Sequence, residues 1–281
     1  MIRVALIAPG AMGSALGRRL VEHGARVATS LAGRSDASAA RAREAGMEAV
    51  SDQTLMKVEI FLSVVPPGEA LALAERFVPW LAGAAKKPVY ADCNAVNPET
   101  VRRIAAAIAA SGAEFVDAGI IGLPPKPGTP GPAIYCSGPS AAAVGVLGAH
   151  GLRIREVHGP IGAASALKMS YAGITKGLTA VASAMTLGAT RAGVQKELLA
   201  ELGESQPQLL GLLQKMVPDM PGKAWRWVAE MEEISGFLDG VAGGGALYRA
   251  VEELYRHVAA DFPKGADVAA LRAFFRREDS L

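Results

Sequence analysis

The beginning of the chain constrains the fold more than any other segment. An apolar run at residues 3–8 predicts a buried strand, and the amphipathic stretch SALGRRLVEHG predicts a helix that ends at Gly24. A glycine-containing turn lies between them, with Ala8 where such turns usually have their first glycine. In a strand–turn–helix unit of this kind, one glycine lets the backbone approach a phosphate and the next lets the helix pack closely on the strand. The segment therefore predicts a dinucleotide-binding turn, with a plain tight turn as the alternative, formed by Pro9, Gly10, Ala11, Met12 and Gly13.

Short β-branched runs continue to about residue 160 and alternate with Ala-rich helical stretches, a rhythm typical of a parallel sheet with crossover helices. The expected strands cover residues 3–8, 26–31, 59–65, 89–92, 115–118, 133–136 and 154–157.

The β-type runs stop after Gly162, and residues 163–193 contain no proline. They predict a helix roughly 40 Å long, which is too long for the sheet domain alone and is expected to reach into a second domain. The stretch GESQPQ around Gly203 and the stretch VPDMPGK from Val217 are expected to break the later helices. The prediction is an α/β protein with an N-terminal Rossmann doubly wound sheet domain at residues 1–160 and an all-α C-terminal domain at residues 161–281.

Composition excludes several classes of partner. The 281 residues include 29 Lys and Arg against 27 Asp and Glu, a net charge of +2 without long like-sign blocks, so neither nucleic acid nor an anionic membrane is expected as a partner. Cys93 and Cys136 are too few for a disulfide scaffold or a four-ligand zinc site, and no metal is expected. No signal peptide is expected, because the short N-terminal apolar run passes straight into glycines. No membrane span is expected, because prolines and glycines interrupt the longest uncharged stretch. A small-molecule substrate and a cytoplasmic location fit these properties.

The end of the second expected strand bears on the choice of cofactor. An NAD-binding protein usually has an acidic residue there to bind the ribose hydroxyls, whereas this chain has Gly33, Arg34 and Ser35. A guanidinium fork beside a hydroxyl suits a 2′-phosphate, so NADP is expected rather than NAD. The alternative for Arg34 is an ordinary solvated charge, and Asp36 can serve as a cap of the following helix.

Several motifs together resemble the β-hydroxyacid dehydrogenase superfamily, which includes 3-hydroxyisobutyrate and 6-phosphogluconate dehydrogenases and is related to the imine reductases. The resemblance covers nearly the whole chain, and its second half is most similar to a less characterised 6-phosphogluconate dehydrogenase-like branch. It rests on APGAMG, SVVPPGEAL, ADCNAVNPET, FVDAGIIGLPP and GPIGAASALKMSYAG. It implies an NADP-dependent oxidoreductase that transfers a hydride between NADP(H) and a small hydroxy or carbonyl compound.

The resemblance also implies that Lys168, near the start of the long helix, is the general acid/base. Helical geometry places Lys168, Tyr171 and Thr175 on one narrow face, where a substrate would meet an ammonium, a phenol and a hydroxyl. Tyr171 stands where the dehydrogenases usually have Asn, so it can share the proton transfer, replace that hydrogen bond or only cover the pocket. A snorkelling surface lysine is the alternative for Lys168, and Lys176 is expected to be solvated.

Further expected site residues follow three of the strands. Val65 and Pro66 are expected beside the nicotinamide ribose. In the resembling dehydrogenases, a Ser-Thr pair and a Ser-Gly-Gly loop hold the substrate carboxylate, and this chain has Asn94 and Ala95 in place of the first. Asn94 is therefore expected at both cofactor and substrate, unless it only caps the helix that begins near residue 98.

The position of the Ser-Gly-Gly loop is occupied by Ile121, Gly122 and Leu123, which predicts a more apolar substrate pocket than is usual. Two other functions stay open, namely reduction of a C=N bond and a non-catalytic dinucleotide-binding sensor. A homodimer is expected, with a site that a partner subunit can complete. Trp225 and Trp227 are expected in the core or in a dimer contact.

Overall fold

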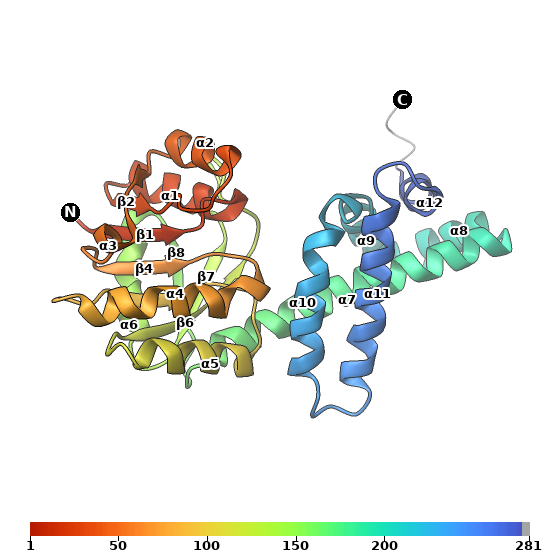
Figure 1. Ribbon diagram of the computed structural model, residues 1–281. Helices are drawn as coiled ribbons and strands as arrows, with labels where there is room; N and C mark the ends of the chain where they lie inside the picture. Colours follow the sequence, from red (N-terminus) through yellow and green to blue (C-terminus); the bar gives the residue numbers. More distant parts are fainter. Residues whose placement is uncertain (277–281) are drawn as a thin grey trace. The chain divides into compact units, whose positions relative to one another are not determined.

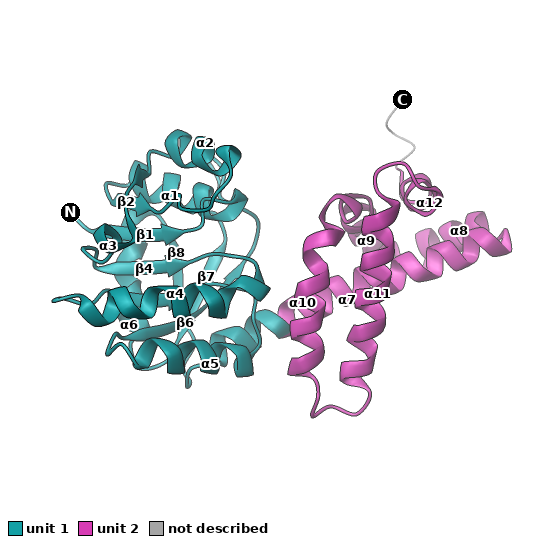
Figure 2. Ribbon diagram, in the orientation of Figure 1, with its two compact units in different colours: residues 1–169 teal, residues 170–281 magenta. Residues whose placement is uncertain are grey.

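The computed structural model describes residues 1–276 and contains two compact units, Met1–Met169 and the chain from Ser170 onward (Figures 1 and 2). The division falls inside α7 (Ala163–Ala192), whereas the sequence prediction places the domain boundary before this helix. The beginning of α7 therefore belongs to unit 1 and the rest of the helix to unit 2.

Unit 1 contains a sheet in the order β3-β2-β1-β4-β5-β6-β7-β8. Neighbouring strands are parallel except β6 and β7, which are antiparallel. The strand order reverses at β1, which lies between β2 and β4, so the predicted doubly wound Rossmann sheet is confirmed. The strands are β1 (Arg3–Ile7), β2 (Arg26–Thr29), β3 (Glu48–Ala49), β4 (Ile60–Ser63), β5 (Val89–Asp92), β6 (Phe115–Ile121), β7 (Ala133–Ser137) and β8 (Arg153–Glu156).

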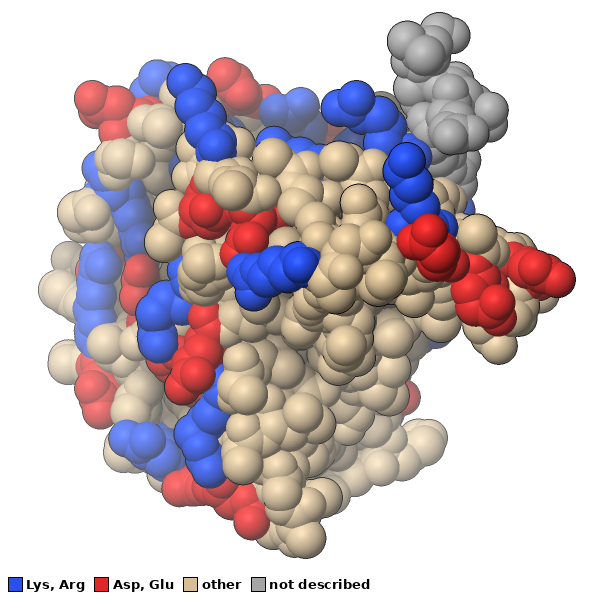
Figure 3. Space-filling model, turned by 90° about the vertical axis from the view of Figure 1, so that its right-hand side faces the viewer, with Lys and Arg blue, Asp and Glu red and all other residues tan. Residues whose placement is uncertain are grey.

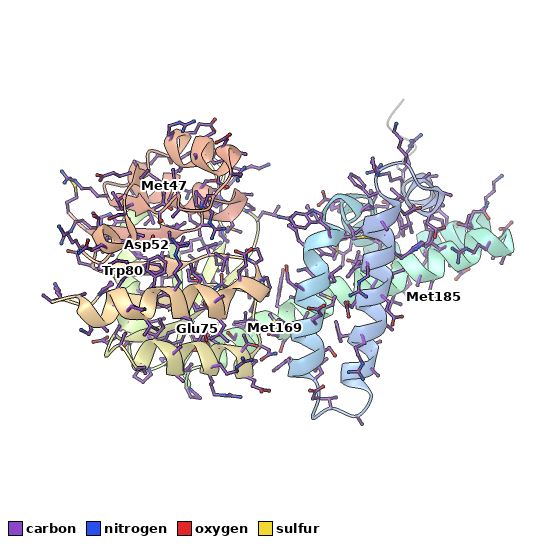
Figure 4. All side chains as sticks on the ribbon, in the orientation of Figure 1. Met47, Asp52, Glu75, Trp80, Met169 and Met185 are labelled. Atoms are coloured by element: carbon purple, nitrogen blue, oxygen red, sulfur yellow. The ribbon has the colours of Figure 1, made fainter. Side chains whose placement is uncertain are left out.

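Both faces of this sheet are buried, as the continuous apolar character of β1 requires. Val4 and Leu6 belong to one hydrophobic core, and Ala5 and Ile7 belong to a second core on the opposite face. The covering helices are α1 (Ala11–Glu22), α2 (Asp36–Glu44), α3 (Asp52–Leu55), α4 (Ala70–Gly83), α5 (Pro98–Ala109) and α6 (Ala141–Gly145), with short 3₁₀ helices η1 (Pro67–Glu69) and η2 (Val146–His150). Side chains fill the space between the layers, for example Met47 against Gly17 of α1 (Figure 4).

Unit 2 is helical throughout its described part (Figure 1). Its α8 ends one residue before Gln206 and its α9 is followed by a 3₁₀ turn, so the breaks predicted near Gly203 and Val217 are confirmed. Besides the remainder of α7, its elements are α8 (Gln195–Ser205), α9 (Pro207–Asp219), η3 (Pro221–Lys223), α10 (Ala224–Phe237), α11 (Gly244–Asp261) and α12 (Ala266–Phe274).

One prediction about unit 2 was wrong, because Lys176 is not solvated. Its ammonium forms an ion pair with Glu230 and lies 4.9 Å from the centre of the Trp227 ring. The Tyr255 hydroxyl donates a 2.5 Å hydrogen bond to the Lys176 carbonyl, and the Tyr255 ring meets Trp227 edge-on. Trp227 is thus part of the packing, whereas Trp225 is mostly exposed.

Candidate functional site

Glycine occupies two positions of the first turn, Gly10 and Gly13, for different physical reasons. A Cβ at Gly13 would lie 2.0 Å from the Ala8 carbonyl oxygen, so close packing of α1 on β1 requires glycine there. Gly10 has an extended backbone (φ −73°, ψ −169°), and a Cβ there would meet nothing within 4 Å. Neither backbone conformation nor protein packing demands glycine at position 10. The open space beside it fits the approach of a ligand to the backbone.

The start of α1 is suited to an anion. Gly10 provides no side-chain cap, and the first turn of α1 has no acidic residue. By contrast, α2 and α5 begin with side-chain caps, Ser35 and Asn97. Among residues 1–276, the N–H groups of Ala11 and Met12 have no hydrogen-bond partner. Free N–H groups and the positive end of the helix dipole fit the pyrophosphate of a dinucleotide.

A group of charged and hydroxyl side chains lies at the carboxyl end of β2. The Arg34 guanidinium, only 23% exposed, lies 3.6 Å from a carboxylate oxygen of Glu69. Ser35 caps α2 by accepting a hydrogen bond from the Ser38 N–H. Arg41 donates from Nε to the Pro9 carbonyl at 2.9 Å and therefore ties α2 to the glycine turn. No local sequence pattern indicated Arg41 or Glu69, because each contacts a residue far away in the chain.

Asn94 is buried, and both the nitrogen and the oxygen of its side-chain amide form hydrogen bonds within the protein. Its Nδ2 donates to Ser63 Oγ at 2.8 Å and to Asp92 Oδ1 at 2.5 Å, and its Oδ1 accepts a hydrogen bond from the Val65 N–H at 2.6 Å. Asn94 thus fixes the backbone at Val65, where β4 passes into the Pro66 turn. The alternative of Asn94 as a helix cap was wrong, because Asn97 caps α5.

Asp92 is a buried carboxyl group beneath Asn94. Its Oδ2 has no hydrogen-bond partner within residues 1–276. Burial raises the pKa of Asp92 to about 7, and the charge of Asp117 contributes to the same shift. The group is therefore poised to change its protonation near neutral pH.

The predicted apolar segment begins at Ile121, the last residue of β6. Gly122 has a φ of +132°, and a Cβ there would lie 3.0 Å from the Pro132 Cα, so glycine is required by both conformation and packing. Leu123 is 70% exposed, whereas Ile121 is partly buried. The proline-rich loop that follows is held by Arg19 of α1, which donates to the carbonyls of residues 126 and 129.

A buried carboxylate on β6 holds the beginning of α7. Asp117 accepts hydrogen bonds from the N–H groups of Gly162 and Ser165 and from the hydroxyls of Ser165 and Ser137. The Ser137 oxygen in turn accepts from the Ala164 N–H. This network fixes the start of α7 on the sheet through charge-assisted bonds to a helix N-terminus. A charged residue inside the apolar strand FVDAGII was a signal that could have identified it.

Lys168 lies one helical turn beyond this network. A Cβ at Gly119 would lie 3.0 Å from both the Lys168 Cβ and the Ala164 carbonyl oxygen, so α7 lies directly against the β6 backbone. Lys168 is half-buried. Its ammonium has no ion-pair or hydrogen-bond partner in the described part of the chain, which leaves it available to a ligand.

Tyr171 and Thr175 follow on α7 but belong to unit 2. The Tyr171 side chain is 51% exposed. The Thr175 hydroxyl donates within the helix to the Tyr171 carbonyl at 2.9 Å. The catalytic role of Tyr171 and the substrate contact of Thr175 stay predictions.

Within unit 1, the predicted residues follow the carboxyl edge of the parallel strands in spatial order (Figure 1). Arg34 and Ser35 follow β2, the glycine turn follows β1, Val65 and Pro66 follow β4, and Asn94 follows β5. Ile121 is the last residue of β6, and Gly122 and Leu123 come directly after it. Three strand spacings, roughly 14 Å, separate β1 from β6. An extended dinucleotide bound at the β1 turn can span such an edge.

Possible metal ligands, long apolar helices and cysteines are the other features to consider in residues 1–276. No group of three or more His, Cys, Asp or Glu side chains is placed to hold a metal ion. None of the described helices combines the length and apolar character needed to cross a bilayer. Cys93 and Cys136 are free and buried, and burial raises the pKa of both thiols, that of Cys136 to about 12.

Comparison with known proteins identifies relatives of both units. The family model described as the NAD binding domain of 6-phosphogluconate dehydrogenase matches residues 3–146, and a domain of unknown function (DUF1932) matches residues 189–258. An uncharacterized 28.5 kDa protein in the 7S RNA 5′ region of Methanothermus fervidus is 30% identical over 207 residues, which are 73% of this chain and 78% of that protein.

Solved structures extend the likeness over almost the whole chain. One is a conserved protein of unknown function that is reported as structurally similar to 3-hydroxyacid dehydrogenases. It is 27% identical with a TM-score of 0.72, and the match covers 98% of this chain and 100% of that protein. A 3-hydroxyisobutyrate dehydrogenase from Salmonella typhimurium is 17% identical (TM-score 0.73; 97% and 100% covered), and an imine reductase from Myxococcus stipitatus is 17% identical (TM-score 0.60; 98% and 100% covered). The last two share the fold.

Proposed function

Because the chain belongs to the β-hydroxyacid dehydrogenase superfamily, we propose that it is an NADP-dependent oxidoreductase acting on a small hydroxy or carbonyl compound. The observation that carries the proposal is the order of groups along the sheet edge. An open glycine turn lies at β1, and a half-buried lysine without a partner among residues 1–276 lies against β6.

The cofactor would lie along this edge with its adenosine end at β2. Arg34 and Ser35 would bind the 2′-phosphate, and the free N–H groups of Ala11 and Met12 would bind the pyrophosphate. Val65 and Pro66, with the backbone fixed by Asn94, would line the nicotinamide ribose. The apolar end of β6 would form one wall of the substrate pocket.

Lys168 would move the proton. When bound, the nicotinamide ring accepts or supplies the hydride. In the reductive direction, the Lys168 ammonium donates a proton to the substrate oxygen as negative charge develops there, and in the oxidative direction the neutral amine removes the hydroxyl proton. Tyr171, on the same helix face, would contribute a phenol hydroxyl to the same substrate.

A second candidate is reduction of a C=N bond. The half-exposed phenol of Tyr171 follows Lys168 by one turn of α7 and offers a different proton donor to an imine nitrogen. A third, the non-catalytic sensor, draws support from Asn94, whose amide hydrogens bond to Ser63 and Asp92.

The test measures cofactor binding and turnover separately. Fluorescence titration with NADPH and NADH gives the two dissociation constants, and NADPH consumption is followed with aldehydes, keto acids and cyclic imines. We expect tighter binding of NADPH and turnover of a carbonyl compound. Turnover of cyclic imines alone would support the second candidate, and binding without turnover would support the sensor.

The chain would act as a homodimer through α7. Apolar side chains with substantial exposure recur along one helical face over roughly 27 Å, at Leu167, Tyr171, Ile174, Val181 and Met185. Met185 is labelled in Figure 4, and in Figure 3 a wide area of the face in view has no Lys, Arg, Asp or Glu. Light scattering of the wild type and of Val181→Glu/Met185→Glu tests this, with a dimer and a monomer expected, respectively.

A further inference from the structure

We infer that Arg41 is a second cation for the 2′-phosphate of the cofactor. The inference rests on the proposed NADP dependence. It adds a specificity residue that lies outside the Gly-Arg-Ser segment from which that preference was predicted.

The contacts of Arg41 place its guanidinium between the two phosphate subsites. Nε donates to the carbonyl of Pro9, the residue before Gly10, at 2.9 Å. Nη2 donates to Ser38 Oγ at 2.9 Å, and this oxygen lies 3.3 Å from Ser35 Oγ. A dinucleotide bound at the glycine turn has its adenosine ribose between its pyrophosphate and its 2′-position. The guanidinium of Arg41 is therefore beside the expected path of that ribose.

The charge of Arg41 is not neutralised by the protein. A guanidinium has five N–H donors, and the described structure uses one on Nε and one on Nη2. No carboxylate within residues 1–276 forms an ion pair with Arg41, although the side chain is half-buried. Arg34 differs, because Glu69 lies 3.6 Å from its Nη1. A half-buried cation with free donors next to a helix N-terminus favours a phosphate.

A purely structural role is the competing explanation. In that case Arg41 would only hold the Pro9 carbonyl and thus the shape of the turn. Loss of the side chain would then weaken every ligand that uses the turn, with or without a 2′-phosphate. The two roles therefore differ in their dependence on one chemical group of the ligand.

Calorimetric titration with two adenosine fragments separates these roles. The fragments are 2′,5′-ADP and 5′-AMP, which differ only by the 2′-phosphate. For Arg41→Met, we expect the affinity for 2′,5′-ADP to fall at least about tenfold, while that for 5′-AMP changes less than about threefold. Arg41→Lys, which keeps the charge but not the fork, should recover part of the loss.

Arg43→Met is the matched control, because Arg43 is an exposed residue of the same helix. It should leave both affinities unchanged, and thermal unfolding should show that all variants are folded. Equal losses for the two fragments, or no loss, would overturn the role of Arg41 alone. A wild-type protein that binds both fragments equally would overturn the proposed NADP dependence and this inference with it.

Discussion

A Cβ at position 119 would lie 3.0 Å from the Cβ of Lys168, so the β6 backbone and the start of α7 are in direct contact where the proposed proton-transfer group begins. The glycine on the strand thus determines how closely the helix approaches the sheet. This contact makes the position of Lys168 sensitive to a residue that has no side chain.

Gly119→Val tests this sensitivity. The added side chain must push α7 away, so we expect a loss of about 1–3 kcal/mol in the free energy of unfolding and a fall of about tenfold in kcat. The affinity for NADPH should stay within about twofold, because the glycine turn is on another strand. Gly83→Val, where an added Cβ meets nothing within 4 Å, is the control. An unchanged kcat in a destabilised Gly119→Val protein would show that this contact does not position the amine.

Lys168→Met tests the proton transfer itself. Removal of the amine should lower kcat by at least about 10²-fold, the usual contribution of a general acid, and leave the NADPH dissociation constant nearly unchanged. Lys86→Met, at an exposed position, should behave as the wild type. Full turnover by Lys168→Met would remove this residue from the mechanism.

Arg34 and Glu69 should have opposite effects on cofactor choice. Because Glu69 lies 3.6 Å from the Arg34 guanidinium, its carboxylate competes with an incoming 2′-phosphate. Arg34→Ala should weaken NADPH by about tenfold or more and NADH by much less, whereas Glu69→Gln should tighten NADPH a few-fold. Titration of each variant with both cofactors measures this. An equal response of the two cofactors would contradict the assignment of Arg34 to the 2′-phosphate.

Asp92 should make stability depend on pH. Its pKa is raised to about 7 in the folded state by burial, whereas in the unfolded chain the carboxyl ionises near pH 4. Between these values the folded state binds more protons, so the contribution of Asp92 to stability falls as pH rises from about 4 to 7 and is constant above that. The free energy of unfolding of Asp92→Asn should lack this fall. Its difference from the wild-type value should therefore rise by on the order of 2 kcal/mol from pH 5 to pH 8.

Urea unfolding at pH 5, 6, 7 and 8 gives this difference. Glu114→Gln, at an exposed position of the same unit, should not alter the pH dependence. Parallel curves for Asp92→Asn and the wild type would mean that the carboxyl group has an ordinary pKa in the folded protein.

Breaking the partly buried ion pair of unit 2 should destabilise the protein more than replacing both of its members. Lys176→Met leaves the Glu230 carboxylate, 16% exposed, without its partner, so we expect a loss of about 3 kcal/mol in the free energy of unfolding. The double variant Lys176→Met/Glu230→Met should lose less than the single one. Lys223→Met, which breaks the more exposed pair with Asp219, should cost less than about 1 kcal/mol. A double variant that loses as much stability as Lys176→Met, or more, would contradict this coupling.

Much of the fold could be predicted from local sequence. The apolar run of β1 and the proline-free length of α7 have strong periodic signals, and both elements lie where they were expected. β3 was missed because it has two residues, both exposed. α1 begins at Ala11 rather than at Ser14, because its first turn contains the glycine motif and not an apolar repeat.

The residues of the candidate site also differ in how far the local sequence could predict them. The glycine turn and Lys168 could be found because their motifs are contiguous in sequence. Arg41 could not, because it meets Pro9 across 32 residues. For Asp117 the sequence offers the signal of a charge inside an apolar strand but not its partner, because Ser165 lies 48 residues away. Such contacts depend on which strands become neighbours, which no local pattern of charges or apolar residues specifies.

The way β6 secures α7 limits where the chain can be cut. A fragment ending at residue 160 would contain every strand of the sheet yet lack Gly162, Ala164 and Ser165, whose groups surround Asp117 and Ser137. Its interior would then keep a carboxylate deprived of most of its donors, a situation that proteins avoid. An isolated nucleotide-binding half made for crystallisation or calorimetry should therefore extend to at least Met169.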